Sequence, residues 1–284
     1  MLTRRSFAAL SAAAAGVALV GPLKLEAAAT RSGLEFGVQL YMVRDRLKDL
    51  PGTLRLIHDI GYASVETYPL VYDRPAKDLR ALIAGIGLKV RSGHFDYQTL
   101  EEMVDYAAEL GVEYMICPSI PRPQWTSLDG FRKAADHLNK AAARARTAGL
   151  KFGYHPHNYE FKQLEGGRGF DVLMQEFDPS VKLELDIYWA TEAGQNPSEM
   201  MQKYRDRLAL IHIKDRKPAT GFTYDPDSPA HFTEAGSGTI DWKKMLGEAR
   251  QLGVSQFLVD QDGSDLPIDK SLRINWNYLS RLRV

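Results

Sequence analysis

The sequence predicts a single (β/α)8 TIM barrel, and two features of the chain carry that prediction. The first is a recurring phrase: an amphipathic helical stretch, then a glycine, then a short run of β-branched or aromatic residues. The second is the number of such short runs, which we read as eight. Eight strand–helix units in about 250 residues is the size of a closed barrel. Helices that alternate with strands imply parallel strands joined by right-handed crossovers.

In each phrase the apolar residues before the glycine recur at helical spacing, and the glycine stands where a helix needs a left-handed C-terminal cap. A doubly wound open sheet is the alternative fold, but no glycine-rich phosphate loop follows the first strand, which continues as GVQLYMVRD. The phrase is clearest in residues 54–66, 79–94, 104–117, 141–155 and 246–260. The eight strands are predicted to end near Gln39, Glu66, His94, Cys117, His157, Asp186, Lys214 and Asp260, with a final helix over residues 271–283.

The first 29 residues are typical of a signal peptide that precedes the barrel domain of residues 30–284. A short basic start is followed by the uncharged stretch Phe7–Val20, and Ala27–Ala29 suits a signal peptidase. Arg4 and Arg5 before Phe7 resemble the twin-arginine export signal. The apolar stretch is shorter than the roughly 20 residues that span a membrane. We therefore expect export to the periplasm and no stable membrane anchor after cleavage; an uncleaved N-terminal anchor is the alternative.

Composition excludes some partners. Without the leader, 33 basic and 35 acidic residues remain, a formal net charge of −2. Because no run of Lys and Arg stands out, we expect no nucleic-acid partner. Cys117 is the only cysteine of the chain, so an intramolecular disulfide is impossible. The oligomeric state is not predicted.

Nearly every predicted strand ends in a polar side chain, and in a barrel of this type these ends form the active site. Along strands alternate residues share a face. Asp186, His212 and Asp260 are therefore predicted to lie at the top of the barrel on successive strands. Their mixed oxygen and nitrogen donors suit Mn²⁺, Co²⁺, Fe²⁺ or Zn²⁺. A fourth ligand is expected from the fifth strand, which carries His155, His157 and, shortly after, Glu160.

The stretches GYHPHNYEF, LELDIYW, IHIKD, GSGTIDW and FLVDQD resemble the strand-end motifs of the sugar phosphate isomerase/epimerase branch of the xylose-isomerase-like TIM barrel superfamily. That resemblance implies one divalent metal ion, held by a Glu, an Asp, a His and a Glu from strands 5 to 8. Asp186 and His212 fall on the Asp and the His. Asp260 stands where a Glu is usual, and the first Glu position leaves His155 and Glu160 open.

The chemistry that this arrangement suits is proton abstraction next to a carbonyl, through an enediolate. The catalytic candidates are Glu160 and His157 as general base and acid, with Lys214 polarising a hydroxyl or carbonyl. The long segment of residues 216–239 is expected to fold over the active face. The candidates for substrate binding are Gln39, Glu66, His94, Trp189 and Asp262.

We expect an exported isomerase or epimerase of a non-phosphorylated sugar or keto-sugar, because phosphorylated sugars belong to the cytoplasm and no phosphate cradle is evident. A metal-dependent lyase or hydratase of 3-keto-glycosides is the alternative, since an enediolate also expels a β leaving group. A non-catalytic sugar-binding barrel is another. A phosphodiesterase would require more metal ligands and a basic groove.

Overall fold

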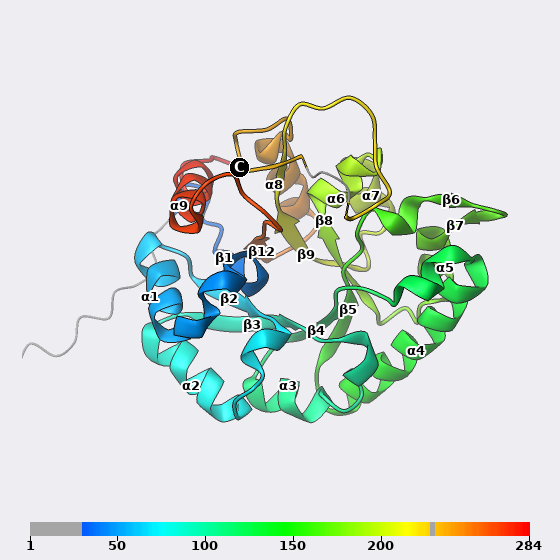
Figure 1. Ribbon diagram of the computed structural model, residues 1–284, viewed down its shortest axis with the longest axis horizontal. Helices are drawn as coiled ribbons and strands as arrows, with labels where there is room; N and C mark the ends of the chain where they lie inside the picture. Colours follow the sequence, from blue (N-terminus) through cyan, green and yellow to red (C-terminus); the bar gives the residue numbers. More distant parts are fainter. Residues whose placement is uncertain (1–29, 228–230) are drawn as a thin grey trace, which may run out of the picture.

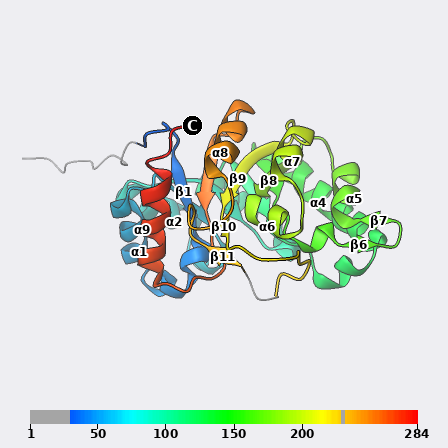
Figure 2. The same cartoon turned by 90° about the horizontal axis from the view of Figure 1, so that it is seen from above.

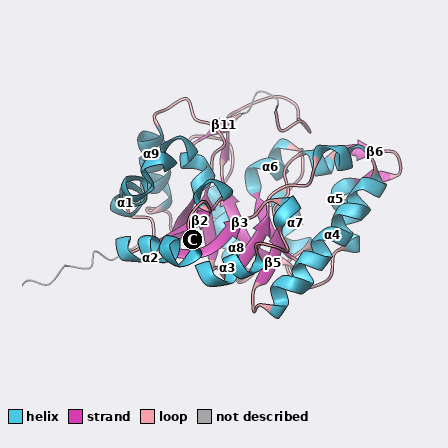
Figure 3. Ribbon diagram, turned by 60° about the horizontal axis from the view of Figure 1, so that its bottom comes forward, coloured by secondary structure: helices cyan, strands magenta, loops and turns pink. Residues whose placement is uncertain are grey.

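The structure is a computed structural model that describes residues 30–227 and 231–284. The predicted signal peptide lies outside the described residues. Eight parallel strands close into a barrel in the order β1-β12-β9-β8-β5-β4-β3-β2, so the predicted (β/α)8 fold is confirmed. The strands lie inside a ring of helices (Figures 1 and 3). The barrel strands are β1 Phe36–Gln39, β2 Ser64–Thr67, β3 Lys89–His94, β4 Tyr114–Cys117, β5 Lys151–Tyr154, β8 Lys182–Asp186, β9 Leu208–Ile213 and β12 Gln256–Val259.

Helices connect successive barrel strands, as the recurring phrase predicts. Among the described residues, no helix combines the length and the apolar character needed to span a membrane. The α-helices are α1 Leu50–Ile60, α2 Ala76–Ile86, α3 Val104–Leu110, α4 Leu128–Thr147, α5 Gly169–Glu176, α6 Ile187–Glu192, α7 Pro197–Lys203, α8 Trp242–Gln251 and α9 Ile268–Leu279. The 3-10 helices are η1 Leu40–Asp49, η2 Pro69–Val71, η3 Tyr97–Thr99, η4 Arg122–Thr126 and η5 Tyr159–Phe161.

The glycines of the recurring phrase end helices in the way the sequence predicts. Gly87 follows α2 with φ +102°, and its N–H bonds back to the carbonyls of Ile83 and Ala84. Gly111 follows α3 with φ +86°. A side chain at either position would be strained in this conformation.

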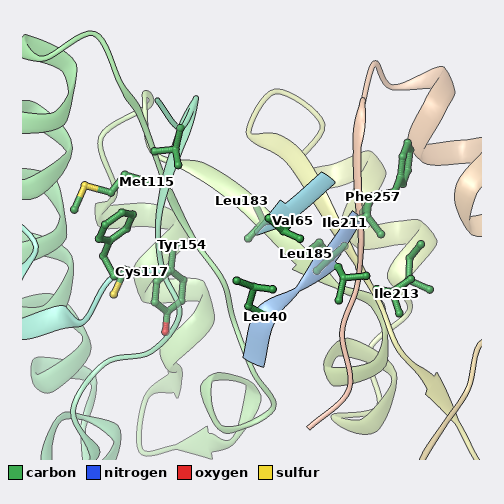
Figure 4. Close-up of a cluster of buried hydrophobic side chains, with 14 of the residues drawn as sticks. Leu40, Val65, Met115, Cys117, Tyr154, Leu183, Leu185, Ile211, Ile213 and Phe257 are labelled. Atoms are coloured by element: carbon green, nitrogen blue, oxygen red, sulfur yellow. The ribbon is translucent and has the colours of Figure 1, made fainter. Parts of the chain in front are cut away.

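Most of the core lies between the strands and the helices. Figure 4 shows side chains of this kind, among them Met115, Leu183, Leu185, Ile211 and Phe257, each at most 1% exposed. Burying one such side chain contributes roughly 1.5–3 kcal/mol. Leu183 and Leu185 alternate with Glu184 and Asp186 along β8, so the two carboxylates face the barrel interior, as predicted for Asp186.

A smaller apolar cluster lies inside the barrel, beneath the polar strand ends. It consists of Ile116, Leu210 and Leu258, all at most 2% exposed. Gly153 faces Ile116 so closely that a Cβ atom there would lie 2.6 Å from the isoleucine Cδ1. Leu210 and Leu258 precede His212 and Asp260 by two residues, on the same face. These two leucines therefore lie beneath the two polar side chains, inside the barrel.

Seven of the eight strands end within one residue of the predicted position, and β5 does not. It ends at Tyr154, whereas the prediction placed its end near His157. His155 N–H still bonds to the Cys117 carbonyl, but Pro156 has no N–H to continue the ladder. The final helix is α9, Ile268–Leu279, and begins three residues before the predicted range.

Two small hairpins stand outside the barrel. One pairs β6 Gln163–Leu164 with β7 Gly167–Arg168. The other pairs β10 Asp215–Arg216 with β11 Phe232–Thr233 and holds the two ends of the long segment that follows β9 (Figure 2). In that segment Thr223 N–H bonds to the Glu192 carbonyl at the end of α6.

Candidate active site

Six buried polar side chains meet inside the barrel, and we call them the lower cluster. They come from β1, β2, β3, β8, β9 and the residue that follows β5. None is more than 6% exposed. The members of the lower cluster are Gln39, Glu66, His94, His155, Glu184 and His212.

Two carboxylates of the lower cluster share the same imidazoles. His94 Nε2 lies 2.8 Å from Glu184 Oε2 and 3.1 Å from Glu66 Oε2. His212 Nε2 lies 2.8 Å from Glu66 Oε2 and 3.4 Å from Glu184 Oε2. One ring nitrogen carries at most one proton, so neither histidine can donate to both carboxylates at once. Gln39 Nε2 adds a donor to Glu66 Oε2 at 2.8 Å.

The charges of the lower cluster shift its pKa values in opposite directions. Burial lowers the pKa of His94, but Glu66 and Glu184 outweigh it and raise the pKa to about 9. Burial, together with the neighbouring His212, holds the pKa of His155 well below its usual value. His155 is therefore a neutral imidazole, and its Nδ1 lies 3.5 Å from Glu184 Oε2.

A second group lies one step nearer the rim, and we call Asp186, Lys214, Asp260 and Asp262 the upper cluster. Lys214 Nζ lies 2.8 Å from Asp260 Oδ2 and 3.3 Å from Asp186 Oδ2, and it also contacts Asp262. The lysine is 1% exposed. Burial lowers its pKa, but the three carboxylates outweigh burial and raise the pKa well above its usual value. Lys214 is thus a buried, paired ammonium.

His212 joins the two clusters. Its Nε2 faces Glu66 and Glu184, whereas its Nδ1 lies 3.5 Å from Asp260 Oδ2 and 3.9 Å from Asp186 Oδ2. The ring therefore presents one nitrogen to each group of carboxylates.

The residues present fit a divalent metal ion. Among the described residues, two groups bring potential ligand atoms within 4.8 Å of one another: His94, His155, Glu184 and His212, and separately Asp186, His212 and Asp260. Nitrogen and carboxylate donors of this kind suit Zn²⁺, Co²⁺, Fe²⁺ and Mn²⁺. Several of these residues, and Glu66 beside them, also have buried polar atoms without a hydrogen-bond partner: Glu66 Oε1, His155 Nδ1, Glu184 Oε1, Asp186 Oδ2, His212 Nδ1 and Asp260 Oδ1.

Glu160, predicted as a ligand or a base, lies behind His157. One of its oxygens accepts a hydrogen bond from the Tyr154 hydroxyl at 2.6 Å, and the other accepts one from His157 N–H at 3.0 Å. Burial raises the Glu160 pKa to about 7. Neither donor group contains Glu160, and its role as a metal ligand stays a prediction. Its contact with the His157 N–H fixes the His157 backbone.

A cleft of about 420 Å³ lies over the upper cluster. The indole of Trp125 stacks on the ring of Tyr159 with centroids 3.7 Å apart. Burial and the charge of Lys214 lower the pKa of His157 to about 3, so this side chain is neutral. The cleft is lined by Tyr41, Ser119, Ile120, Pro121, Arg122, Trp125, His157, Tyr159, Trp189, Pro226, Asp227, Phe232 and Asp262.

The segment predicted to fold over the active face does so. Pro226, Asp227 and Phe232 line the cleft, and Asp227 pairs with Arg122. Its ends are anchored by Asp215, whose carboxylate accepts N–H groups from Gly236 and Ile240.

The motif GSGTIDW is a structural motif. A Cβ atom at Gly238 would lie 2.3 Å from Asp215 Oδ1, so only glycine fits. Asp241 caps α8 by accepting a hydrogen bond from Lys244 N–H.

The predicted site residues fall into three places. Gln39, Glu66, His94, His155 and His212 belong to the lower cluster; Asp186, Lys214, Asp260 and Asp262 belong to the upper cluster; His157 and Trp189 line the cleft. Sequence reasoning did not select Glu184 as a site residue. The sequence contained the information needed to select Glu184, because this residue alternates with Leu183 and Leu185 and shares a face with Asp186.

The chain is similar to one family model and to several known enzymes. The model of the xylose isomerase-like TIM barrel matches residues 54–260. An inosose dehydratase from Geobacillus kaustophilus is 24% identical over 243 residues, which cover 73% of this chain and 78% of that protein. A 2-epi-5-epi-valiolone 7-phosphate 2-epimerase from Actinoplanes sp. is 28% identical over 142 residues, which cover 50% of this chain and 48% of that enzyme.

A solved structure agrees in fold over nearly the whole chain. The crystal structure of a sugar phosphate isomerase/epimerase from Parabacteroides distasonis is 25% identical, with a TM-score of 0.73. The match covers 88% of this chain and 94% of that one.

Proposed function

The chain belongs to the xylose isomerase-like TIM barrel family, and on that premise we propose that it is an exported, divalent-metal-dependent isomerase or epimerase of a non-phosphorylated sugar or keto-sugar. It is an enzyme of the sugar isomerase/epimerase-like class, as are the relatives with which it aligns. The observation that carries the proposal is the position of His212, between two groups of carboxylates and beneath an aromatic cleft.

One ion of Mn, Co, Fe or Zn is the cofactor in this proposal. Both donor groups contain His212, so either would hold the ion with an imidazole and at least one carboxylate. Bound there, the ion supplies positive charge that acidifies a C–H bond next to a carbonyl and stabilises the enediolate.

The proton transfers fall to side chains that line or underlie the cleft. His157 lines the cleft as a neutral imidazole, and we assign to it the proton transfer at the substrate carbon. Glu160 fixes the backbone of His157 through the contact with its N–H. The Lys214 ammonium lies 5.2 Å from the centre of the Trp189 ring and donates to a substrate oxygen from below.

The lining of the cleft favours an uncharged sugar. The aromatic residues in the lining, Trp125, Tyr159, Trp189 and Phe232, suit the C–H side of a sugar ring. Arg122 is paired with Asp227, and Lys214 is paired with three carboxylates. Among the described residues, therefore, no unpaired Lys or Arg lines the cleft.

Dehydration or lysis is the second candidate function, including lysis of 3-keto-glycosides. It is supported by the inosose dehydratase relative, of which the alignment covers 78%. The same enediolate expels a leaving group that is β to the carbanion, so one site serves both outcomes.

Export is part of the proposal because residues 1–29 read as a twin-arginine signal peptide. An exported enzyme meets free sugars, keto-sugars and glycosides. This location agrees with an uncharged substrate.

The test is deuterium incorporation from D2O. The full-length chain, loaded separately with Mn²⁺, Co²⁺, Fe²⁺ and Zn²⁺, is incubated with free aldoses, ketoses and 3-keto-glycosides. Isomerisation or epimerisation yields a product that carries deuterium next to the carbonyl, as seen by NMR and mass spectrometry. Loss of water or of the aglycone identifies the lyase instead.

A chelator-treated sample and the His157→Gln variant serve as controls. Exchange should vanish with the chelator and fall at least about 100-fold in the variant, the size of a typical general-base contribution. Sugar binding without exchange under every metal would contradict the proposal and identify a non-catalytic sugar-binding barrel.

A further inference from the structure

A second pocket lies beside the substrate cleft, and we call it the side pocket. Its volume is about 240 Å³. It is formed by η1, which follows β1, and by the stretch 261–268, which follows β12, so it belongs to the carboxyl end of the barrel. Asp262 lines both the side pocket and the cleft. The two spaces therefore meet at this residue, whose side chain remains 26% exposed although it contacts Lys214.

Contacts on both sides hold the junction at Asp262 in place. Tyr41 lines the cleft and Arg44 lines the side pocket, and the Arg44 guanidinium carbon lies 4.2 Å from the centre of the Tyr41 ring. Arg44 also donates hydrogen bonds to the carbonyls of Tyr41 and Asp262, at 3.0 and 2.7 Å. One side chain thus ties the residues that follow β1 to those that follow β12.

Gly263 leaves open the passage between the two spaces. Gly263 lines the side pocket, and a Cβ atom added to it would meet only Phe232 Cδ2, at 3.9 Å. Phe232 lines the cleft. The φ angle of Gly263 lies outside the left-handed region, so the backbone does not require a glycine here. A larger side chain would therefore fit the backbone and narrow the passage.

The lining of the side pocket suits a neutral ring that carries hydroxyl groups. Its charged groups are the Arg44 guanidinium and the carboxylates of Asp45 and Asp262. Two carboxylates against one cation disfavour an anion, whereas a hydroxyl can pair with either charge. Arg44 has no carboxylate within 4 Å among the described residues, so N–H groups beyond the two that bond to carbonyls are available. Met42 and Leu266 add apolar surface, a mixture typical of ligand pockets.

The sizes of the two spaces suit two linked rings. Pockets for whole ligands have volumes of about 300–1,000 Å³. The cleft, at about 420 Å³, falls in this range, and the side pocket, at about 240 Å³, falls below it. The side pocket therefore has the size of one ring added to a ligand whose reacting ring occupies the cleft.

We infer that the side pocket is a second sugar subsite, so that the substrate is a disaccharide. The reacting keto-sugar ring lies in the cleft over the upper cluster. The second, neutral sugar ring passes Gly263 and Asp262 into the side pocket, where Arg44 donates hydrogen bonds to its hydroxyls. This step rests on the proposed function and names its substrate class. Binding of the remote ring would raise kcat/KM for the reaction in the cleft.

The test compares two substrates that differ only in the second ring: 3-keto-cellobiose, with the keto group on the non-reducing ring, and methyl 3-keto-β-glucoside. Exchange of the C–H next to the carbonyl gives kcat/KM for each with the metal-loaded, full-length chain. We expect wild type to prefer the disaccharide at least about 10-fold, the effect of one or two additional hydrogen bonds. Equal values, or a preference for the methyl glucoside, overturn the inference.

The variant Gly263→Leu tests whether the preference arises in the side pocket. By narrowing the passage it should lower the ratio of the two kcat/KM values at least about 10-fold. Gly247→Leu is the matched control, because Gly247 lies in α8 and an added Cβ atom meets nothing within 4 Å. It should leave the ratio within about 2-fold of wild type. An unchanged ratio in a folded Gly263→Leu variant overturns the inference.

Calorimetric binding of the same two sugars separates this inference from the proposed function. Tighter binding of the disaccharide that Gly263→Leu abolishes, without exchange of any sugar under any metal, upholds the subsite and refutes the proposed function. Exchange with equal affinity for both sugars upholds the proposed function and overturns the subsite. Because the wild-type comparison needs no variant, it holds even if Gly263→Leu fails to fold.

Discussion

Lys214 shows how one side chain sets the electrostatics of this site. It is the only partner cation within 4 Å of Asp186, Asp260 and Asp262 among the described lysines and arginines. A buried ion pair of this type contributes little compared with an apolar pair, but removing one partner leaves buried charge uncompensated. We therefore expect a strong asymmetry: mutating Lys214 should lower the free energy of unfolding much more than mutating a surface lysine does.

Lys214→Met tests that asymmetry. We expect the free energy of unfolding to fall by about 3–5 kcal/mol at pH 7, because three carboxylates lose their counter-charge. Lys217→Met is the matched control: Lys217 pairs with the exposed Asp265, and an exposed pair contributes about 0–1 kcal/mol. Urea unfolding of both variants measures the difference. Equal losses would show that the Lys214 pairs are not formed in solution.

Glu160 gives a prediction for the pH dependence of stability. Burial raises its pKa from 4.5 to about 7 in the folded protein. Between these two values the unfolded chain releases the proton that the folded chain keeps, so the stability contributed by Glu160 falls as pH rises from 4.5 to 7. A shift of this size corresponds to about 3 kcal/mol.

The measurement compares urea unfolding of wild type and Glu160→Gln at pH 5 and pH 8. The variant cannot ionise at this position, so its stability relative to wild type should increase on going to pH 8. An unchanged difference between the two proteins would mean that Glu160 titrates near its ordinary pKa.

At the scale of elements, strand alternation was the informative part of the sequence. In Lys182–Asp186 the alternation of leucine and carboxylate correctly placed Asp186 inside the barrel. The pairing of Glu184 with His94 was not predictable, because the two residues lie on strands that are not neighbours in the sheet. The position of the Lys214 ammonium was equally hidden, since it depends on rotamers chosen by three carboxylates from two strand ends.

Asp215 anchors the segment that covers the cleft. Its carboxylate accepts backbone N–H groups from Arg216, Gly236, Gly238 and Ile240. Asp215→Ala leaves these donors unpaired, and we expect a loss of at least about 3 kcal/mol in the free energy of unfolding. Asp241→Ala removes only the cap of α8 and should lose about 1 kcal/mol. Chemical denaturation ranks the two; the reverse order would show that the segment is held from elsewhere.

At the scale of the whole molecule, the proposed export signal would link export to folding. A twin-arginine signal carries folded proteins, and the eight strands of this barrel close only when both ends of the chain are in place, because β1 pairs with β12. The chain would therefore fold, and take up its ion, before it crosses the membrane.

Replacing Arg4 and Arg5 with lysine is expected to abolish that route. The double variant should stay in the cytoplasm in folded form, whereas wild type should appear in the periplasm without residues 1–29. Cell fractionation with N-terminal sequencing of the product distinguishes the two. Export of the double-lysine variant at the wild-type level would contradict the twin-arginine assignment.

Removing the metal ion tests whether the ion stabilises the whole barrel against unfolding. The potential ligands come from β3, β8, β9 and the ends of β5 and β12, so an ion that binds only the folded chain stabilises the entire barrel. At 100 times its Kd, Co²⁺ should add about 2.7 kcal/mol to the free energy of unfolding. A chelator should reverse this gain, and His212→Asn should abolish it, because His212 belongs to both donor groups. If Co²⁺ binds stoichiometrically and the urea midpoint does not move, the ion binds the unfolded chain equally well and does not stabilise the barrel.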